Sequence, residues 1–237
     1  QAMEMTKWFD TNYHYIVPEF SRDTTFSLSS TKPVDEYEEA KAHGVETRPV
    51  LIGPVSFLLL GKTQEDDLEA LDLLDDLLPV YAEVLQKLAD AGAEAVQLDE
   101  PNLVLDLSDE ERAAFTRAYE ALSRQLSGLD LDLHVATYFG GLEDNLPTAL
   151  DLPVDALHLD LVRAPGQLEA ALDHGVPEDL SLSLGVIDGR NVWRADLDSL
   201  LETVETAVDA LGSDRVLVGP SCSLLHVPVD LDTEPAL

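Results

Sequence analysis

The sequence predicts an α/β protein of the (β/α)₈-barrel class, with six of the eight strand–helix units and an extended segment before them. Two observations support this fold. Buried apolar strands alternate regularly with amphipathic helices along the 237 residues, and that alternation implies a parallel sheet with right-handed crossovers. Polar, glycine or proline residues directly follow each strand, and barrels of this class carry their functional residues at the C-terminal ends of the strands.

The first segment, residues 3–19 (MEMTKWFDTNYHYIVPE), packs four aromatic residues between polar ones. Its partial alternation predicts a strand or strand-like loop. It contains Lys7, Asn12 and His14, and lysine is scarce in this chain. A lysine set among aromatics and amides is therefore a candidate binding residue. The structural alternative is an aromatic edge strand with the stem of Lys7 lying along apolar surface.

Six apolar segments are predicted to supply the strands of the barrel. The first, 48–60, contains a strand, a Gly53-Pro54 turn and the start of a helix. The other five are 93–98, 131–138, 156–162, 180–187 and 215–219. Six strands are two short of a closed barrel, so the sequence predicts two parallel edge strands without partners, which is a liability for solubility.

Helices are predicted between and around these strands. Gly44 and Gly92 mark the ends of two of them, and Ser108 with Glu111 forms the capping box that begins a third. The predicted helical segments are 33–43, 68–91, 108–126, 142–150 (a short helix or turn), a helix ending near 174, and 197–211. Residues 22–30 and the tail after His226 are predicted to be loops.

The charge balance is the most unusual feature of the composition. Fourteen basic and 47 acidic residues give a formal net charge of −33, which repels nucleic acid and anionic membranes and argues against both as partners. The acids are spread over the predicted helix faces instead of forming one tail. This pattern indicates a solvated acidic surface of the kind that salt-adapted proteins use.

Length and composition favour one cytoplasmic domain spanning residues 1–237. Apolar residues make up 45% of the chain, enough for a sizeable core. No apolar run is long enough for a membrane span, and the N-terminus lacks the pattern of a signal peptide. The single cysteine, Cys222, excludes an internal disulfide and a cysteine-rich zinc site.

Two polar clusters after strands are further candidates. Asp99 and Glu100 are adjacent, so in an extended segment their side chains point in opposite directions. We expect one to face the pocket and the other to cap the following loop. Arg190 and Arg194 lie in the segment DGRNVWR, where they either bind carboxylates bidentately or form salt bridges with the acidic surface of the chain.

Cys222 and His226 do not form a convincing thiol–base pair, because their spacing in a turn is poor and nothing orients the histidine. A small buried cysteine at a strand end is the better interpretation. His134 and His158 lie within apolar strands and are predicted to be core histidines with satisfied nitrogens. No set of His, Cys and carboxylate residues has the spacing of a zinc site.

Seven segments, in this order and spacing, together resemble the N-terminal half of cobalamin-independent methionine synthase. They are EMTKWFDTNYHYIVPE, RPVLIGPVSFL, VQLDEPNLVL, VATYFGG, LHLDLV, GVIDGRNVWR and PSCSLLHVPVDL. The resemblance covers essentially the whole chain and about a third of the usual length of the family. It implies one of two face-to-face (β/α)₈ barrels in an enzyme that transfers a methyl group from 5-methyltetrahydropteroyl-polyglutamate to homocysteine.

The resemblance also implies roles for individual residues. Lys7 matches the lysine that binds the folate polyglutamate tail, and Asn12 matches an asparagine found at the same site in part of the family. A lysine facing a polyanionic tail also satisfies charge pairing. The two missing strands would precede residue 1, and the catalytic C-terminal barrel is the implied partner.

Zinc is the cofactor of the family and is held by the C-terminal barrel. In this chain Val135 and Thr137 stand where a metal-binding copy of the barrel would carry ligands, and only Cys222 matches a zinc cysteine. One soft ligand does not make a tetrahedral site, so no metal and no catalytic residue is predicted here, and the fragment is predicted to be inactive alone.

Two other functions remain open from the sequence. The first is a stand-alone binding or scaffold protein derived from the barrel, without methyl transfer. The second is a separate barrel enzyme that uses residues after the strands, namely Asp99, Glu100, Arg190 and Cys222.

Overall fold

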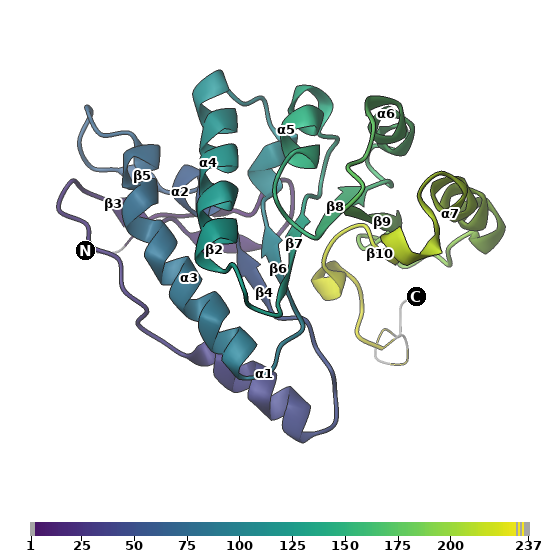
Figure 1. Cartoon of the computed structure of the whole chain (residues 1–237), viewed down its shortest axis with the longest axis horizontal. Helices are drawn as coiled ribbons and strands as arrows, with labels where there is room; N and C mark the ends of the chain where they lie inside the picture. The colour runs from purple at the N-terminus through teal and green to yellow at the C-terminus, as the bar shows by residue number, and fades with distance from the viewer. Residues whose placement is uncertain (1–2, 231, 233, 235–237) are drawn as a thin grey trace.

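A curved sheet of six parallel strands forms the centre of the computed structural model, which describes residues 3–230, 232 and 234 (Figure 1). The order across this sheet is β10-β9-β8-β7-β6-β4, so each strand pairs with its neighbours in the sequence. The six strands are β4 (Val50–Ile52), β6 (Ala95–Asp99), β7 (Asp132–Ala136), β8 (Ala156–Asp160), β9 (Ser181–Ile187) and β10 (Val216–Pro220). They correspond to the six predicted strands, which confirms the fold class.

The two faces of the sheet differ in chemistry. Alternate residues point outward, and in the central strands these are fully buried leucines and valines such as Leu98, Val135 and Leu157. Helices surround the outer face of the sheet (Figure 1). The inward face carries smaller and polar residues, including Gln97, His158 and Ser183. Alternation within each strand thus separates the hydrophobic core from a polar interior.

The helices follow the strands as predicted. They are α1 (Lys32–Ala42), α2 (Pro54–Leu59), α3 (Leu74–Asp90), α4 (Asp109–Gln125), α5 (Leu146–Leu150), α6 (Gln167–His174) and α7 (Leu197–Leu211). Short 3₁₀ turns accompany them, namely η1 (Ala70–Leu73), η2 (Pro101–Val104), η3 (Glu143–Asn145), η4 (Ser213–Arg215) and η5 (Leu224–His226). The capping box of Ser108 and Glu111 is present at the start of α4, and Gly44 and Gly92 adopt positive φ angles just after α1 and α3.

The predicted start of the long helix at residue 68 is wrong. The α-helix begins at Leu74, and the 3₁₀ turn η1 precedes it. Glu69 and Asp72 form a reciprocal capping box around that turn. Their side chains bond to backbone N–H groups at the start of this turn, which begins the helical segment in 3₁₀ form before α3.

The opening segment forms a β-hairpin, in agreement with the extended conformation predicted for it. Strands β1 (Met5–Lys7) and β2 (His14–Ile16) pair antiparallel, with Lys7 opposite His14. A second small sheet joins β3 (Glu19–Phe20) to β5 (Lys62–Thr63) in parallel. The sequence did not predict this pairing, because two-residue strands carry no periodicity.

The sheet does not close within the described residues. Strands β4 and β10 are its two edges, and apolar residues on them remain exposed, with Val50 54% and Val218 57% accessible. This is the predicted arrangement of six strands from an eight-stranded barrel, with the interior accessible through the gap between the edges.

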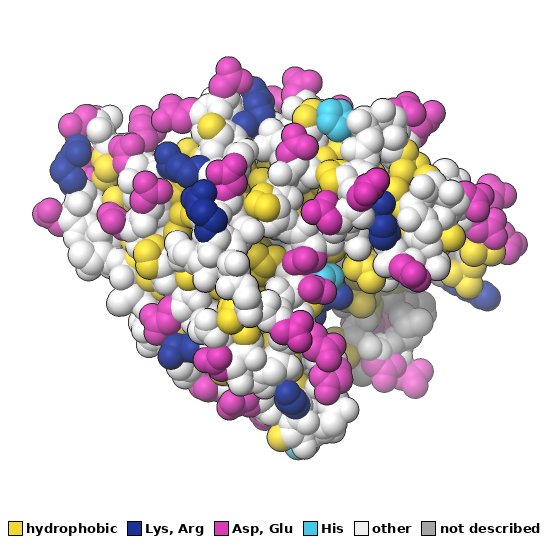
Figure 2. All heavy atoms as spheres, in the orientation of Figure 1, with side chains coloured by type: hydrophobic (Ala, Val, Ile, Leu, Met, Phe, Trp, Pro, Cys, Tyr) yellow, Lys and Arg dark blue, Asp and Glu magenta, His cyan; other side chains and the backbone are white. Residues whose placement is uncertain are grey.

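Acidic side chains are spread across the visible face of the molecule, and few basic ones lie among them (Figure 2). This distribution agrees with the prediction of a dispersed acidic surface. No helix in the described part of the chain is both long and apolar enough to cross a membrane.

Candidate functional site

The N-terminal hairpin carries both residues predicted to bind the polyglutamate tail. Lys7 ends β1, and Asn12 lies in the turn that leads to β2. Both residues are exposed, and no described carboxylate forms an ion pair with Lys7. An unpaired lysine is notable in a chain with 47 acidic residues. The hairpin therefore presents a free cation to solvent.

The turn of the hairpin packs on the C-terminal ends of the barrel strands through aromatic rings. The ring of Phe9 lies 5.9 Å from that of Phe139, which follows β7. Tyr13 contacts the ring of His226 at 5.2 Å and donates a hydrogen bond to the carbonyl of Leu225. Phe9 and Phe139 both have positive φ angles, a backbone conformation uncommon for such residues. These contacts place Lys7 and Asn12 on the face where such barrels carry their functional groups.

Asp10, in the same turn, forms ion pairs with two arginines. Its carboxylate accepts hydrogen bonds from Arg163, after β8, at 2.8 Å and from Arg190, after β9, at 2.5 Å. Partial burial acts to raise the pKa of Asp10, but the hydrogen bonds and charges of Arg190 and Arg163 outweigh it and hold the pKa below its usual value. Arg190 thus binds a carboxylate of its own chain, whereas Arg194 is exposed and forms no ion pair within the described residues.

A cavity of about 450 Å³ lies inside the open barrel. Its wall includes Asp99, Tyr138 and Cys222 from the ends of three strands, His158 from the middle of β8, and Arg48 from the segment before β4. Asp99 accepts hydrogen bonds from Gln97 at 2.8 Å and from the hydroxyl of Tyr138 at 3.0 Å. Asp99 is therefore the residue of the Asp99-Glu100 pair that faces the pocket.

Glu100 points the other way, as expected for its neighbour, but the predicted cap on the following loop is wrong. Its fully buried carboxylate accepts hydrogen bonds from the backbone N–H groups of Val55 and Ser56 and from the hydroxyl of Tyr119. It thereby caps α2, the helix after the adjacent strand β4. The N-cap residue of α2 is Gly53, which has no side chain to do so. Burial raises the pKa of Glu100 to about 7, although these donors counteract part of the effect.

The described residues do not fit a zinc site. Cys222 is buried, its thiol pKa is raised by burial, and its sulfur contacts the Ser221 hydroxyl and the Ser223 carbonyl. No group of three or more His, Cys, Asp or Glu residues able to hold a metal occurs within the described ranges. A tetrahedral zinc site needs four ligands in total, three of them from protein even in an open catalytic site.

The two strand histidines differ from each other. The sequence predicts that the ring nitrogens of His158 have hydrogen-bond partners, and its Nδ1 lies 2.9 Å from the Ser183 hydroxyl. The same prediction is wrong for Nδ1 of His134, which has no hydrogen-bond partner within the described part of the chain. Burial lowers the pKa of His134 to about 4, which keeps this ring neutral at physiological pH.

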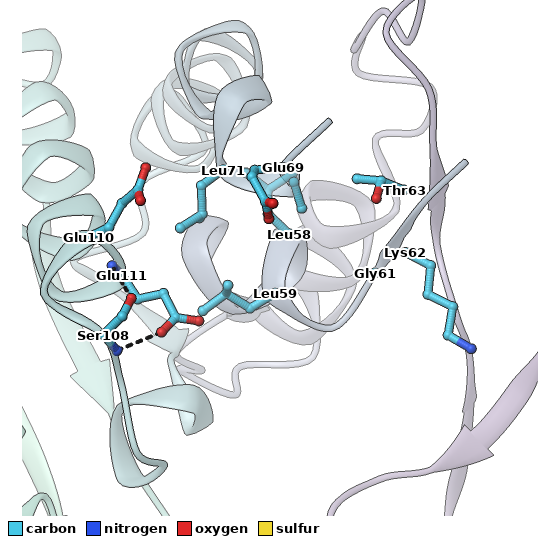
Figure 3. Close-up of a pocket in the computed structure, with 11 residues that line it drawn as sticks. Leu58, Leu59, Gly61, Lys62, Thr63, Glu69, Leu71, Ser108, Glu110 and Glu111 are labelled. Carbon is cyan, nitrogen blue, oxygen red and sulfur yellow. Dashed lines mark hydrogen bonds between the residues drawn. The ribbon is translucent and has the colours of Figure 1, made fainter. Parts of the chain in front are cut away.

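A larger hollow, of about 580 Å³, lies outside the sheet between α2, η1 and the start of α4 (Figure 3). Glu69, Glu110 and Glu111 line it, together with the side chains of Leu58 and Leu59. Neither Lys7 nor Asn12 borders this hollow, and Glu111 is already engaged in the capping box with Ser108 (Figure 3). It is therefore not part of the candidate site on the strand ends.

Replacing Asp99 by asparagine is expected to remove a pH-dependent contribution to stability. Burial raises the pKa of Asp99 to about 6, despite the hydrogen bonds from Gln97 and Tyr138. The folded state thus binds this proton more tightly than the unfolded state. The contribution is fully present below pH ~4 and is lost as the pH rises through ~6. The wild-type chain should therefore lose about 2 kcal/mol relative to Asp99→Asn between pH ~4 and ~7.

Urea unfolding of both proteins at stepped pH measures this difference. Asp106→Asn, at an exposed position, is the control and should give a nearly flat difference curve. A flat curve for Asp99→Asn as well would show that the pKa of Asp99 is not raised in the folded protein.

Comparisons with a family model and with curated proteins point to the same family. Residues 1–212 match the family model of the cobalamin-independent synthase N-terminal domain. The chain is 84% identical over 237 residues to a protein of Salinibacter ruber named 5-methyltetrahydropteroyltriglutamate–homocysteine methyltransferase. It is 61% identical over 236 residues to proteins of the same name from Rhodopseudomonas palustris and Caulobacter vibrioides. In each case all of this chain is covered, and it spans 30% of the length of these curated relatives.

Solved structures show the same fold at low sequence identity. A B12-independent methionine synthase from a Shewanella species superimposes with a TM-score of 0.70 at 15% identity, covering 92% of this chain and 66% of the other. A putative vitamin-B12-independent methionine synthase from Listeria monocytogenes gives a TM-score of 0.68 at 17% identity, covering 87% and 67%. These similarities support the barrel architecture of the chain.

Proposed function

Because the chain belongs to the cobalamin-independent synthase family, as a member of its N-terminal domain group, we propose that residues 1–237 form one domain, most of the N-terminal barrel of a longer cytoplasmic enzyme. That enzyme transfers a methyl group from 5-methyltetrahydropteroyl-polyglutamate to homocysteine and so makes methionine. The names of the curated relatives support this activity. The C-terminal catalytic barrel is the partner of this domain.

The proposed role of this domain is to bind the polyglutamate tail of the folate and to support the catalytic half. The observation that carries this role is the unpaired, exposed Lys7 on a hairpin at the C-terminal end of the barrel. A lysine that pairs with no carboxylate of the described part of so acidic a chain is available for the carboxylates of a ligand. Asn12, exposed in the turn of the same hairpin, supplies an amide that donates to the same kind of group.

Zinc, when bound by the catalytic half, supplies activation of the homocysteine thiol by lowering its pKa. The residues described here do not fit that metal, so the proposed contribution of this domain is confined to binding. It holds an anionic tail at a position set by the hairpin and the barrel face. In that arrangement the domain adds affinity and leaves the reacting atoms to the other barrel.

Lys7→Ala tests the proposal in the full-length enzyme. We expect the affinity for the triglutamate folate to fall about tenfold, because one charge-assisted contact to a carboxylate is lost. The affinity for the monoglutamate folate, which lacks the extended tail, should be unchanged. Calorimetric titration with both folates separates these effects.

Lys87→Ala is the matched control, because Lys87 lies on α3 and its ammonium forms an ion pair with Glu83 of the same helix, at 3.6 Å. The substitution also removes one positive charge, but at a position 80 residues from Lys7 in the sequence. It should leave the affinities for the triglutamate and monoglutamate folates unchanged. If Lys7→Ala binds the triglutamate as tightly as the wild-type enzyme, Lys7 is not the tail-binding residue.

A further inference from the structure

We propose that Asp10 is a positioning residue for the polyglutamate site, acting through a cluster that we term the hairpin anchor (Asp10, Arg163 and Arg190). This inference rests on the proposed function of Lys7. Asp10 itself touches no ligand in this scheme. It fixes the turn of the hairpin on the barrel, so that Lys7, three residues before it, and Asn12, two residues after it, are held in place.

The hairpin anchor connects the turn to two different strands of the barrel. Arg163 follows β8 and donates Nη2 to one carboxylate oxygen of Asp10, while Arg190 follows β9 and donates Nη1 to the other. Nη2 of Arg190 also lies 3.4 Å from the backbone carbonyl of Asp10. Contacts to both oxygens and to the backbone restrain the orientation of the turn as well as its position.

Aromatic contacts join the charged ones into a single unit. The guanidinium of Arg190 lies over the ring of Phe139, 5.1 Å from its centre. The ring of Phe9 packs on the same Phe139 at 5.9 Å. Arg190 is therefore held between Asp10 and an aromatic face, and its side chain is only 25% exposed. Desolvation of this kind strengthens both the ion pair and the cation–π contact.

The two short strands of the hairpin contribute little to holding its tip in place. Each strand has three residues, and Met5 and Ile16 on its outer face are 66% and 58% exposed. A two-stranded hairpin is marginally stable alone. Its base is tied by the Lys62–Glu4 ion pair and by the Tyr15 hydroxyl bonded to the Leu60 carbonyl. Besides the aromatic contacts and the hydrogen bond from the Tyr13 hydroxyl to the Leu225 carbonyl, the tip is tied to the barrel by the ion pairs of Asp10.

The sign of one substitution distinguishes positioning from simple electrostatics. Asp10 is an anion close to Lys7 in sequence, so by Coulomb attraction and repulsion alone its neutralisation strengthens the binding of an anionic tail. Neutralisation also releases two arginines that could bind the tail themselves. If Asp10 instead positions the turn, Asp10→Asn weakens binding, because the loosened hairpin must be ordered when the ligand binds.

The experiment compares Asp10→Asn, Asp10→Glu and the control Asp173→Asn, an exposed carboxylate on α6, in the full-length enzyme. We expect Asp10→Asn to weaken triglutamate folate binding about fivefold and to leave monoglutamate binding unchanged. Asp10→Glu, which keeps the charge, should recover most of the affinity. Amide hydrogen exchange at residues 8–13 should accelerate in Asp10→Asn and stay unchanged in Asp173→Asn.

Unchanged or tighter triglutamate binding by Asp10→Asn overturns the inference, as does unchanged hydrogen exchange in the turn. Lys7→Ala in the same series separates this failure from a failure of the proposed function. If Lys7→Ala weakens binding and Asp10→Asn changes neither binding nor exchange, the folate role stands and the anchor does not. If Lys7→Ala has no effect while Asp10→Asn accelerates exchange, the anchor orders the hairpin and the folate assignment fails.

Discussion

Replacing Glu100 by alanine should destabilise the protein by about 4 kcal/mol, because several buried groups lose their partner together. The carboxylate is fully buried and accepts from two backbone N–H groups at the start of α2 and from the Tyr119 hydroxyl. Without it, the first turn of α2 and the Tyr119 hydroxyl are left unsatisfied around a new cavity. Urea-induced unfolding followed by circular dichroism measures the loss.

Two further variants make this prediction specific. Glu100→Gln keeps the shape but replaces one acceptor oxygen by a donor facing backbone N–H groups, so we expect a loss of about 2 kcal/mol. Glu110→Ala removes an exposed carboxylate of α4 and should change the free energy of unfolding by no more than about 0.5 kcal/mol. A loss for Glu100→Ala as small as that of Glu110→Ala would mean that water replaces the carboxylate without cost.

Replacing Gly53 by alanine is expected to cost about 3 kcal/mol, because the added methyl group overlaps Glu100. A Cβ at this position would lie 2.1 Å from both Cδ and Oε1 of Glu100. The backbone of Gly53 is extended, with φ −70° and ψ 154°, so its conformation suits alanine and the whole cost is steric. Glu100 is unable to move aside without giving up its hydrogen bonds.

Gly219→Ala is the matched control, since within the described structure no heavy atom beyond its own residue and its two chain neighbours lies within 4 Å of the Cβ that it adds. It should leave the unfolding midpoint close to that of the wild-type protein. The double variant Gly53→Ala with Glu100→Ala gives a second test. If the overlap with Glu100 causes the loss, the double variant is destabilised by less than the sum of the single changes. Strict additivity would place the cost of Gly53→Ala elsewhere.

Much of the fold follows from local patterns in the sequence. Each strand of the large sheet is a short apolar run bounded by polar or turn residues, and some helices carry their own capping signals, as Ser108 and Glu111 show for α4. Such signals depend on residues close together in the sequence, so the tertiary structure does not alter the elements that they predict. The predicted start of α3 is too early because the apolar pattern of the helix continues back into residues 70–73, which form the 3₁₀ turn η1.

The contacts that organise the ends of the strands are harder to predict from the sequence. Glu100 caps a helix 45 residues before it in the chain, and Asp10 reaches Arg163 and Arg190 across the barrel face. Neither partner lies within the span of a local motif. One signal did exist, because an aspartate among the aromatics of the first segment, in a chain with only 14 basic residues, is a candidate partner for the arginines after the later strands.

The hairpin anchor joins residues that are far apart in the sequence, and this separation bears on the order of folding. Each strand of the large sheet pairs with its sequence neighbour, whereas Asp10 contacts residues 153 and 180 positions away. Longer loops cost more entropy to close, and distant contacts form later than near ones. We therefore expect the sheet to assemble first, and the first strand pair of the chain to dock last. Lys7 then reaches its final position only on a barrel that is already complete through β9.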